Sequence, residues 1–143
     1  MLGTLNDAQI DALLRSETVG RIGCMVDGEP YVVPVTYAYD GEAVYAHSAE
    51  GMKLRGLRTS PRACFEVEHV HDLANWRSVI AWGTFEELHG AAAERGMRVL
   101  VEKLTPLAGS ETAAPAHGAA PRHASAVIYR IRLDRRTGRF EKR

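Results

Sequence analysis

Two Asp-Gly pairs, Asp27-Gly28 and Asp40-Gly41, constrain the fold of this chain more than any other feature. Each pair lies between segments in which apolar residues recur with the alternation of a strand. Asp-Gly in that setting is a strong signal for a tight turn between antiparallel strands. The sequence therefore predicts an antiparallel meander that begins at residues 19–26 and continues through residues 43–47.

Helices and further strands surround this meander. Residues 6–16 have an amphipathic pattern that opens with a capping box, Asn6 followed by Gln9. Apolar residues at helical spacing predict two more helices, at 52–58 and 91–104. The expected strands are residues 19–26, 31–39, 43–47, 62–68, 76–88 and 126–133, with a polar loop at 70–75. The predicted fold class is α+β and mainly β, a six-stranded antiparallel barrel or curled sheet with short flanking helices.

The length of 143 residues is enough for one domain with its own core, and a single domain over residues 1–143 is predicted. Residues 105–124 contain three prolines and two glycines and are expected to form a flexible loop. No apolar run approaches the roughly 18 residues that span a bilayer. Because no signal peptide is visible either, the expected compartment is the cytoplasm, with no membrane partner.

The charges of the chain balance, with 18 Lys and Arg against 18 Asp and Glu. Nucleic-acid-binding domains usually carry a basic excess, so no nucleic-acid partner is expected. The arginines near the C-terminus are interpreted as the exposed end of a strand. Cys24 and Cys64 lie in apolar runs and are expected to be reduced thiols in the core.

Residues 45–57 have the pattern of a phosphate-binding turn, in which a strand ends, a small polar turn follows and a basic helix begins. The first backbone N–H groups of a helix are unpaired and carry the positive end of its dipole. Ser48 can add a hydroxyl donor, Gly51 lets an anion approach the backbone, and Lys53 supplies a full charge. In the preceding strand Pro34 cannot donate to a sheet, so it marks an edge, a bulge or a ligand-facing break.

Several segments, taken in order and spacing, resemble the FMN-binding split-barrel superfamily, which includes pyridoxamine 5'-phosphate oxidase. Within it the chain looks most like the branch of the nitroimidazole-resistance proteins. The segments that carry the resemblance are residues 20–23, 31–37, 44–48, 51–54, 60–65 and 76–79. The resemblance implies a six-stranded split barrel that forms a homodimer, with FMN bound at the subunit interface.

The resemblance also implies a set of cofactor contacts. The strand around Pro34 would lie along the isoalloxazine, the turn would hold the phosphate, and a third segment would complete the site. The implied cofactor-binding residues are Val33, Pro34, Val35, Thr36, Tyr37, His47, Ser48, Lys53, Trp76, Arg77 and Ser78. Alternation along a strand places Arg77 and Ser78 on opposite faces, so both reach one ligand only if the strand has a bulge.

The activity that the resemblance implies is flavin-dependent reduction of a small organic substrate, for which a nitro-aromatic compound is one candidate. His47 and His71 are the candidate catalytic residues, and Tyr37, His71 and Trp76 are expected to line the pocket. The chain has Met52 where pyridoxamine 5'-phosphate oxidases have an arginine, and no tryptophan follows Trp82. Oxidation of the vitamin itself is therefore not expected.

Two other cofactors remain as alternatives. Deazaflavin F420 has a longer anionic tail, for which Arg55 and Arg58 are available. A non-catalytic heme- or flavin-binding protein is the other alternative, and His69 and His71 motivate a heme ligand. The acidic and histidine residues of segment 66–72 do not indicate a metal site, because no further ligand has motif spacing.

Overall fold

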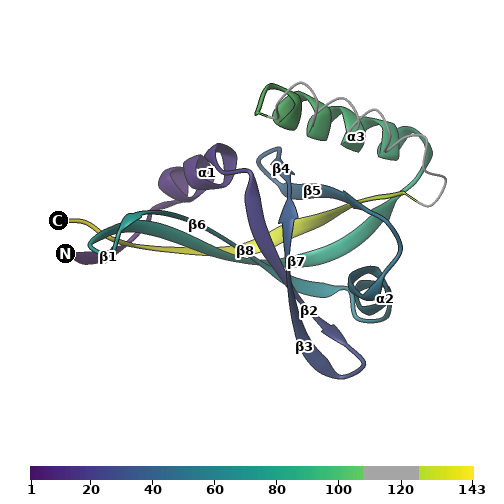
Figure 1. The fold of residues 1–143 in the computed structure, drawn as a ribbon, viewed down its shortest axis with the longest axis horizontal. Coiled ribbons are helices and arrows are strands. Elements are labelled where there is room, and N and C mark those ends of the chain that lie inside the picture. Colours follow the sequence, from purple (N-terminus) through teal and green to yellow (C-terminus); the bar gives the residue numbers. More distant parts are fainter. Residues whose placement is uncertain (108–125) are drawn as a thin grey trace.

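The computed structural model describes residues 1–107 and 126–143, which form one antiparallel sheet with helices packed around it (Figure 1). The helices are α1 (Asp7–Ser16), α2 (Met52–Thr59), α3 (Gly90–Leu104) and the 3₁₀ helix η1 (Thr105–Leu107). The strands are β1 (Leu2–Thr4), β2 (Val19–Val26), β3 (Glu29–Thr36), β4 (Ala38–Tyr39), β5 (Ala43–Ser48), β6 (Arg62–Asp72), β7 (Asn75–Leu88) and β8 (Val127–Glu141). The fold is mainly β with short helices, which confirms the predicted fold class.

The sheet curls without closing into a barrel. Its strand order is β3-β2-β6-β7-β8-β5-β4, and β1 pairs with β8. Strands β3 and β4 are the two ends of this order, yet only Tyr37 separates them in the chain. The two edges of the sheet therefore meet at Tyr37 and diverge from there, which is the architecture of a split barrel.

The predicted strands differ from the structure in several places within the described residues. The short strand β1 was missed, the strand predicted at 31–39 is divided at Tyr37 into β3 and β4, and β8 continues to Glu141 instead of ending at residue 133. The expected polar loop at 70–75 is strand up to Asp72, whose carboxylate accepts from the Ala74 N–H at 2.8 Å and closes a tight turn. Polar residues on the solvent face of long strands hid the strand period in both segments.

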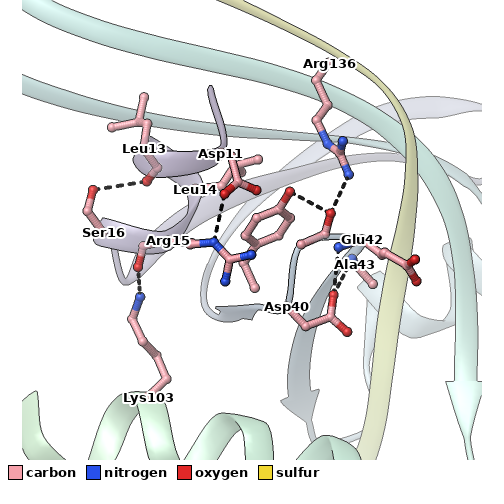
Figure 2. Close-up of polar contacts among 12 residues, drawn as sticks. Asp11, Leu13, Leu14, Arg15, Ser16, Asp40, Glu42, Ala43, Lys103 and Arg136 are labelled. Atoms are coloured by element: carbon pink, nitrogen blue, oxygen red, sulfur yellow. Dashed lines mark hydrogen bonds and ion pairs between the residues drawn. The ribbon is translucent and has the colours of Figure 1, made fainter. Parts of the chain in front are cut away.

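The first helix begins as predicted. The Asn6 side chain accepts from the Gln9 N–H at 2.9 Å, and the Gln9 side chain accepts from the Asn6 N–H at 2.8 Å. Figure 2 shows how α1 is held at its other end, where Lys103 of α3 donates to the Arg15 carbonyl. On the strand side, the buried Tyr37 hydroxyl donates to the Leu14 carbonyl at 2.7 Å. These bonds fix α1 against the point where the two edges of the sheet meet.

The main core lies inside the curled sheet and is lined by aliphatic and aromatic side chains from β2, β5, β6, β7 and β8. At its centre the fully buried rings of Tyr37 and Phe65 meet edge to face, with centroids 4.9 Å apart. Both cysteines are free thiols, and Cys24 is buried whereas Cys64 is half-buried on the other face. The prediction of reduced thiols is confirmed, but Cys64 does not belong to the core.

The segment predicted as a flexible loop, 105–124, is described only over η1, and residues 108–124 lie outside the described part of the chain. The basic C-terminal segment is strand β8, as the sequence interpretation expected. No helix among the described residues is long and apolar enough to cross a membrane.

Candidate functional site

The turn between β5 and α2 has the features of an anion site. Gly51 precedes the first helical residue with an extended backbone and no side-chain cap, so the first N–H groups of α2 have no side-chain acceptor there. The Ser48 hydroxyl donates to the Ala49 carbonyl at 2.6 Å. The backbone of the turn and Lys53 are therefore the donors on which an anion would depend.

Lys53 points from the first turn of α2 toward Tyr129 of β8. Its amine lies 5.8 Å from the centroid of the Tyr129 ring, and burial lowers the pKa of the amine. The Tyr129 hydroxyl is buried and has no hydrogen-bond partner among the described residues, and burial raises its pKa. A buried hydroxyl without a partner is costly, so this group calls for an acceptor such as a water molecule or a ligand.

Lys53 also forms no salt bridge with a carboxylate in the described part of the chain, unlike its helical neighbours. Arg55 pairs with Asp27 at 2.8 Å. Arg58 pairs with Glu50 at 2.6 Å and with Glu87 at 2.7 Å. The amine of Lys53 is thus the cation of α2 that is available to an external anion. Arg55 and Arg58 are already neutralised, so they offer little to the long anionic tail of F420.

Strand β3 is an open edge of the sheet. It begins the strand order and pairs with β2, with Pro34 opposite Arg21. The edge position predicted for Pro34 is confirmed. Because β3 has no second partner strand among the described residues, alternate backbone groups face outward and can bind the polar edge of a flat ring. Val33 is half-buried, Val35 is buried, and Pro34 and Thr36 are exposed.

The Tyr37 side chain does not reach any pocket. It is fully buried, its hydroxyl is bonded to Leu14, and its N–H donates to the Thr18 carbonyl at 3.0 Å. The expectation that its side chain lines the substrate pocket is therefore wrong. The spacing of the strand gave the correct face, but that face is the core.

The predicted site residues of the phosphate turn and those of β7 lie at opposite ends of the molecule. Tyr129, which contacts Lys53, lies opposite Glu87 near the end of β7, whereas Ser78 lies nine positions earlier on the same strand. At roughly 3.3 Å per residue, the two places are about 30 Å apart. His47 belongs to the Lys53 end, and Trp76, Arg77 and His71 lie at the other end. One copy of the chain does not bring all predicted residues together.

The outer face of the sheet, opposite to the core, carries a charged cluster in which Arg21 joins two of the acidic residues of segment 66–72, a pairing that the sequence analysis did not identify. Arg21 lies 3.4 Å from Glu66 and 3.0 Å from Glu68, so one guanidinium serves two carboxylates. Burial and the hydrogen bond with Glu68 raise the pKa of Glu66 to about 7. Exposed apolar side chains share this face, namely Val19, Met25, Val32 and Ile80. Patches of this kind usually mark an interaction surface.

We expect Glu66→Gln to stabilise the protein at pH 8 and to have little effect at pH 5. The folded-state pKa of Glu66 is raised, so its contribution to stability is present below about pH 4.5 and is lost as the pH rises to about 7. Glutamine is uncharged at every pH and so resembles the protonated form of Glu66. Because the side chain is partly exposed, we expect a gain of only roughly 2–4 °C in melting temperature at pH 8.

Thermal melts of both proteins at the two pH values measure this difference. Glu42→Gln, an exposed carboxylate on another strand connection, is the matched control. An equal gain at both pH values would contradict the assignment to Glu66.

The histidines of β6 do not gather metal ligands. His69 lies 3.4 Å from Glu17, and alternation places it on the face opposite to Glu66 and Glu68. Among the residues that the structure describes, no group of three or more His, Cys, Asp or Glu side chains is arranged to hold a metal ion.

Comparison with known proteins identifies the family to which this architecture belongs. A family model described as pyridoxamine 5'-phosphate oxidase matches residues 6–140. The chain belongs to this family. The family predicted from the sequence is thus confirmed, and the curled sheet with the open β3 edge is this family's fold.

Individual members of the pyridoxamine 5'-phosphate oxidase family and related structures are similar over nearly the whole chain. An uncharacterised protein of Rhizobium meliloti is 27% identical over 134 residues, which cover 85% of this chain and 83% of the relative. A FAD-binding protein from Mesorhizobium loti has a TM-score of 0.77 and 29% identity, with 100% of this chain and 98% of that chain covered. A Bacteroides thetaiotaomicron protein, assigned by its description to 5-nitroimidazole antibiotic resistance, has a TM-score of 0.74 and 19% identity, with 98% and 89% covered.

Tyr129 is the site residue of this family member that sequence reasoning missed. It occupies the inward face of β8 together with Val127 and Ile131. The alternation of that segment predicts a core position, and nothing in the pattern shows that its ring lies near the Lys53 amine. Only the fold brings β8 and α2 together.

Proposed function

We propose that this protein is an FMN-binding oxidoreductase that reduces a small organic molecule. The observation that carries the proposal is the uncompensated Lys53 amine in the first turn of α2, which lies 5.8 Å from the centroid of the Tyr129 ring, whose hydroxyl has no partner among the described residues. Both groups donate hydrogen bonds, and the N–H groups of the first helical turn add to them. Such a set of donors suits a phosphate group.

The chain's residues would divide the work of holding the cofactor. Lys53, Tyr129 and the backbone of the turn would bind the phosphate, and the open edge of β3 around Pro34 would bond the polar edge of the ring. FMN, when bound, supplies the electron-transfer chemistry of the reaction, so the protein needs no nucleophile of its own. His47, which lies at the end of β5 next to the turn, is the candidate for a catalytic role near the ring.

One phosphate fits the charges of the turn better than a longer anion. A FAD diphosphate or the tail of F420 would need more cations, yet Arg55 and Arg58 are occupied by Asp27, Glu50 and Glu87. This supports FMN over FAD and over F420. The heme alternative has less support, because His69 is engaged with Glu17 on an exposed strand.

We also propose that the protein works as a homodimer. The separation of about 30 Å between Lys53 and Ser78 means that Trp76 and Ser78 can contact the flavin only from a second copy. The apolar outer face supplies a surface for such a partner. Arg77 is not included, because β7 has no irregularity at this point and its side chain lies on the face opposite to Ser78. A nitro-aromatic compound is the substrate that we would test first.

An absorption spectrum of the purified protein, with mass identification of the released cofactor, tests this proposal. We expect the spectrum of an oxidised flavin, the mass of FMN and, by light scattering, the mass of a dimer. A colourless protein that does not take up added FMN would contradict the assignment. Release of FAD, F420 or heme would instead replace FMN with that cofactor.

A further inference from the structure

A cavity lies at the end of the sheet where both chain termini are found (Figure 1). Its volume is about 530 Å³, within the range of small-molecule sites. We call it the terminal pocket, and the residues that define it are Leu5, His69, His71, Trp76, Arg77 and Phe140. It lies at the opposite end of β7 from Lys53, so within one chain it is separate from the phosphate turn.

The floor of the terminal pocket is a row of side chains across four strands. Arg77 of β7 lies opposite His69 of β6 on one side and opposite Phe140 of β8 on the other. Phe140 lies opposite Gly3 of β1, where a Cβ would come within 2.6 Å of the Phe140 ring. The missing side chain at Gly3 thus leaves room for the ring. A guanidinium, an imidazole and a phenyl ring are therefore placed side by side.

Arg77 has no partner of its own in the described part of the chain. Other arginines of the sheet are paired with carboxylates, for example Arg62 with Asp134 at 2.7 Å and Arg130 with Glu86 at 2.9 Å. Arg77 forms no hydrogen bond or ion pair with a described residue. Its planar set of donors is therefore available at the wall of a pocket whose other walls are largely apolar.

We propose that the terminal pocket binds a small aromatic carboxylate. The guanidinium of Arg77 would take the carboxylate through two parallel hydrogen bonds, which is the pairing that arginine geometry favours. The ring of the ligand would lie against Phe140 and Leu5. A single negative charge suits the pocket better than a phosphate dianion, because the positive charges of Arg77 and Lys142 are partly offset by Glu141, which also borders the pocket, and by Glu17 beside His69.

Calorimetric titration of the full-length protein, as purified, tests the ligand class. The probes are naphthalene-2-carboxylate and its neutral amide, which have nearly the same shape and apolar area. We expect the carboxylate to bind at least about tenfold more tightly, because hydrogen bonds to charged groups are the stronger ones. Equal affinities, or no binding of either probe at millimolar concentration, would overturn the proposal.

Substitutions at Arg77 test the residue. We expect Arg77→Gln to remove the preference for the carboxylate, and Arg77→Lys to keep part of it because the charge stays while the planar fork is lost. Both variants should melt like the wild type, since Arg77 forms no hydrogen bond or ion pair with a described residue. Arg139→Gln, which removes an arginine on the neighbouring strand opposite Ser78, is the matched control. Unchanged binding of the carboxylate to Arg77→Gln would refute the assignment.

The same titrations separate this inference from the proposed function. Lys53→Met should leave the binding of naphthalene-2-carboxylate intact, whatever it does to FMN. A protein without flavin that still discriminates between the two probes would refute the flavin proposal and retain the terminal pocket. A flavin-loaded protein that does not discriminate between the two probes would refute the terminal pocket and retain the flavin proposal.

Discussion

Lys53→Met is expected to weaken FMN binding by roughly 10- to 100-fold, the largest effect on cofactor affinity that we predict for a single side chain. Methionine keeps the length and apolar stem that pack toward Tyr129 but removes the charge. A hydrogen bond between a cation and a phosphate is a strong one. Lys53 is not paired with any carboxylate among the described residues, so its charge is available to the phosphate. The loss should therefore appear in cofactor affinity and not in folding.

Fluorescence titration of FMN into apo-protein measures the effect, with thermal melts of the apo-proteins as the check on folding. Arg55→Ala is the matched control, because it removes a cation from the same helix whose charge is already paired with Asp27. We expect less than a threefold change for the control. Equal losses in both variants would point to a general electrostatic attraction, and an unchanged affinity in Lys53→Met would remove Lys53 from the site.

Local signals in the sequence were sufficient for much of this fold. The capping box at Asn6 placed α1, the two Asp-Gly turns placed β2 to β5, and Pro34 limited its strand to an edge, a bulge or a ligand-facing break, of which the structure shows the edge. Each of these signals acts within a few residues, which is why it can be read without a structure. The failures, at β8 and at the turn after Asp72, came from strands whose exposed faces are polar.

The candidate site could be predicted only in part, because its second component is not local. Lys53 is placed by the turn and the helix start that precede it in the chain. Tyr129 reaches it because β8 pairs with β5, and two of the carboxylates that neutralise Arg55 and Arg58, Asp27 and Glu87, come from distant parts of the chain. The same holds for Arg77 and Phe140, which are neighbours only because β7 pairs with β8. The spacing of residues in the sequence does not show which strands pair with one another.

Gly56→Ala is expected to destabilise the protein by about 2 kcal/mol and to lower its melting temperature by roughly 5–8 °C. Gly56 is buried in α2 where the helix packs on β2. A Cβ at this position would lie 2.4 Å from the Met25 carbonyl oxygen and 2.7 Å from a Val26 methyl group. The nearest obstacle is backbone, which cannot rotate away, so the helix must shift. The better helix propensity of alanine, worth about 1 kcal/mol, offsets only part of this cost.

A shift of α2 would also move Lys53, which lies one turn earlier on the same helix. We therefore expect Gly56→Ala to lose FMN affinity as well as stability, whereas Lys53→Met loses affinity alone. Arg55→Ala again serves as the control, since it places alanine on the exposed side of α2. Thermal melts combined with FMN titrations distinguish the two variants. A Gly56→Ala protein with wild-type stability would show that α2 is not packed on β2 as closely as the structure has it, and the position of Lys53 beside Tyr129 would then lose its support.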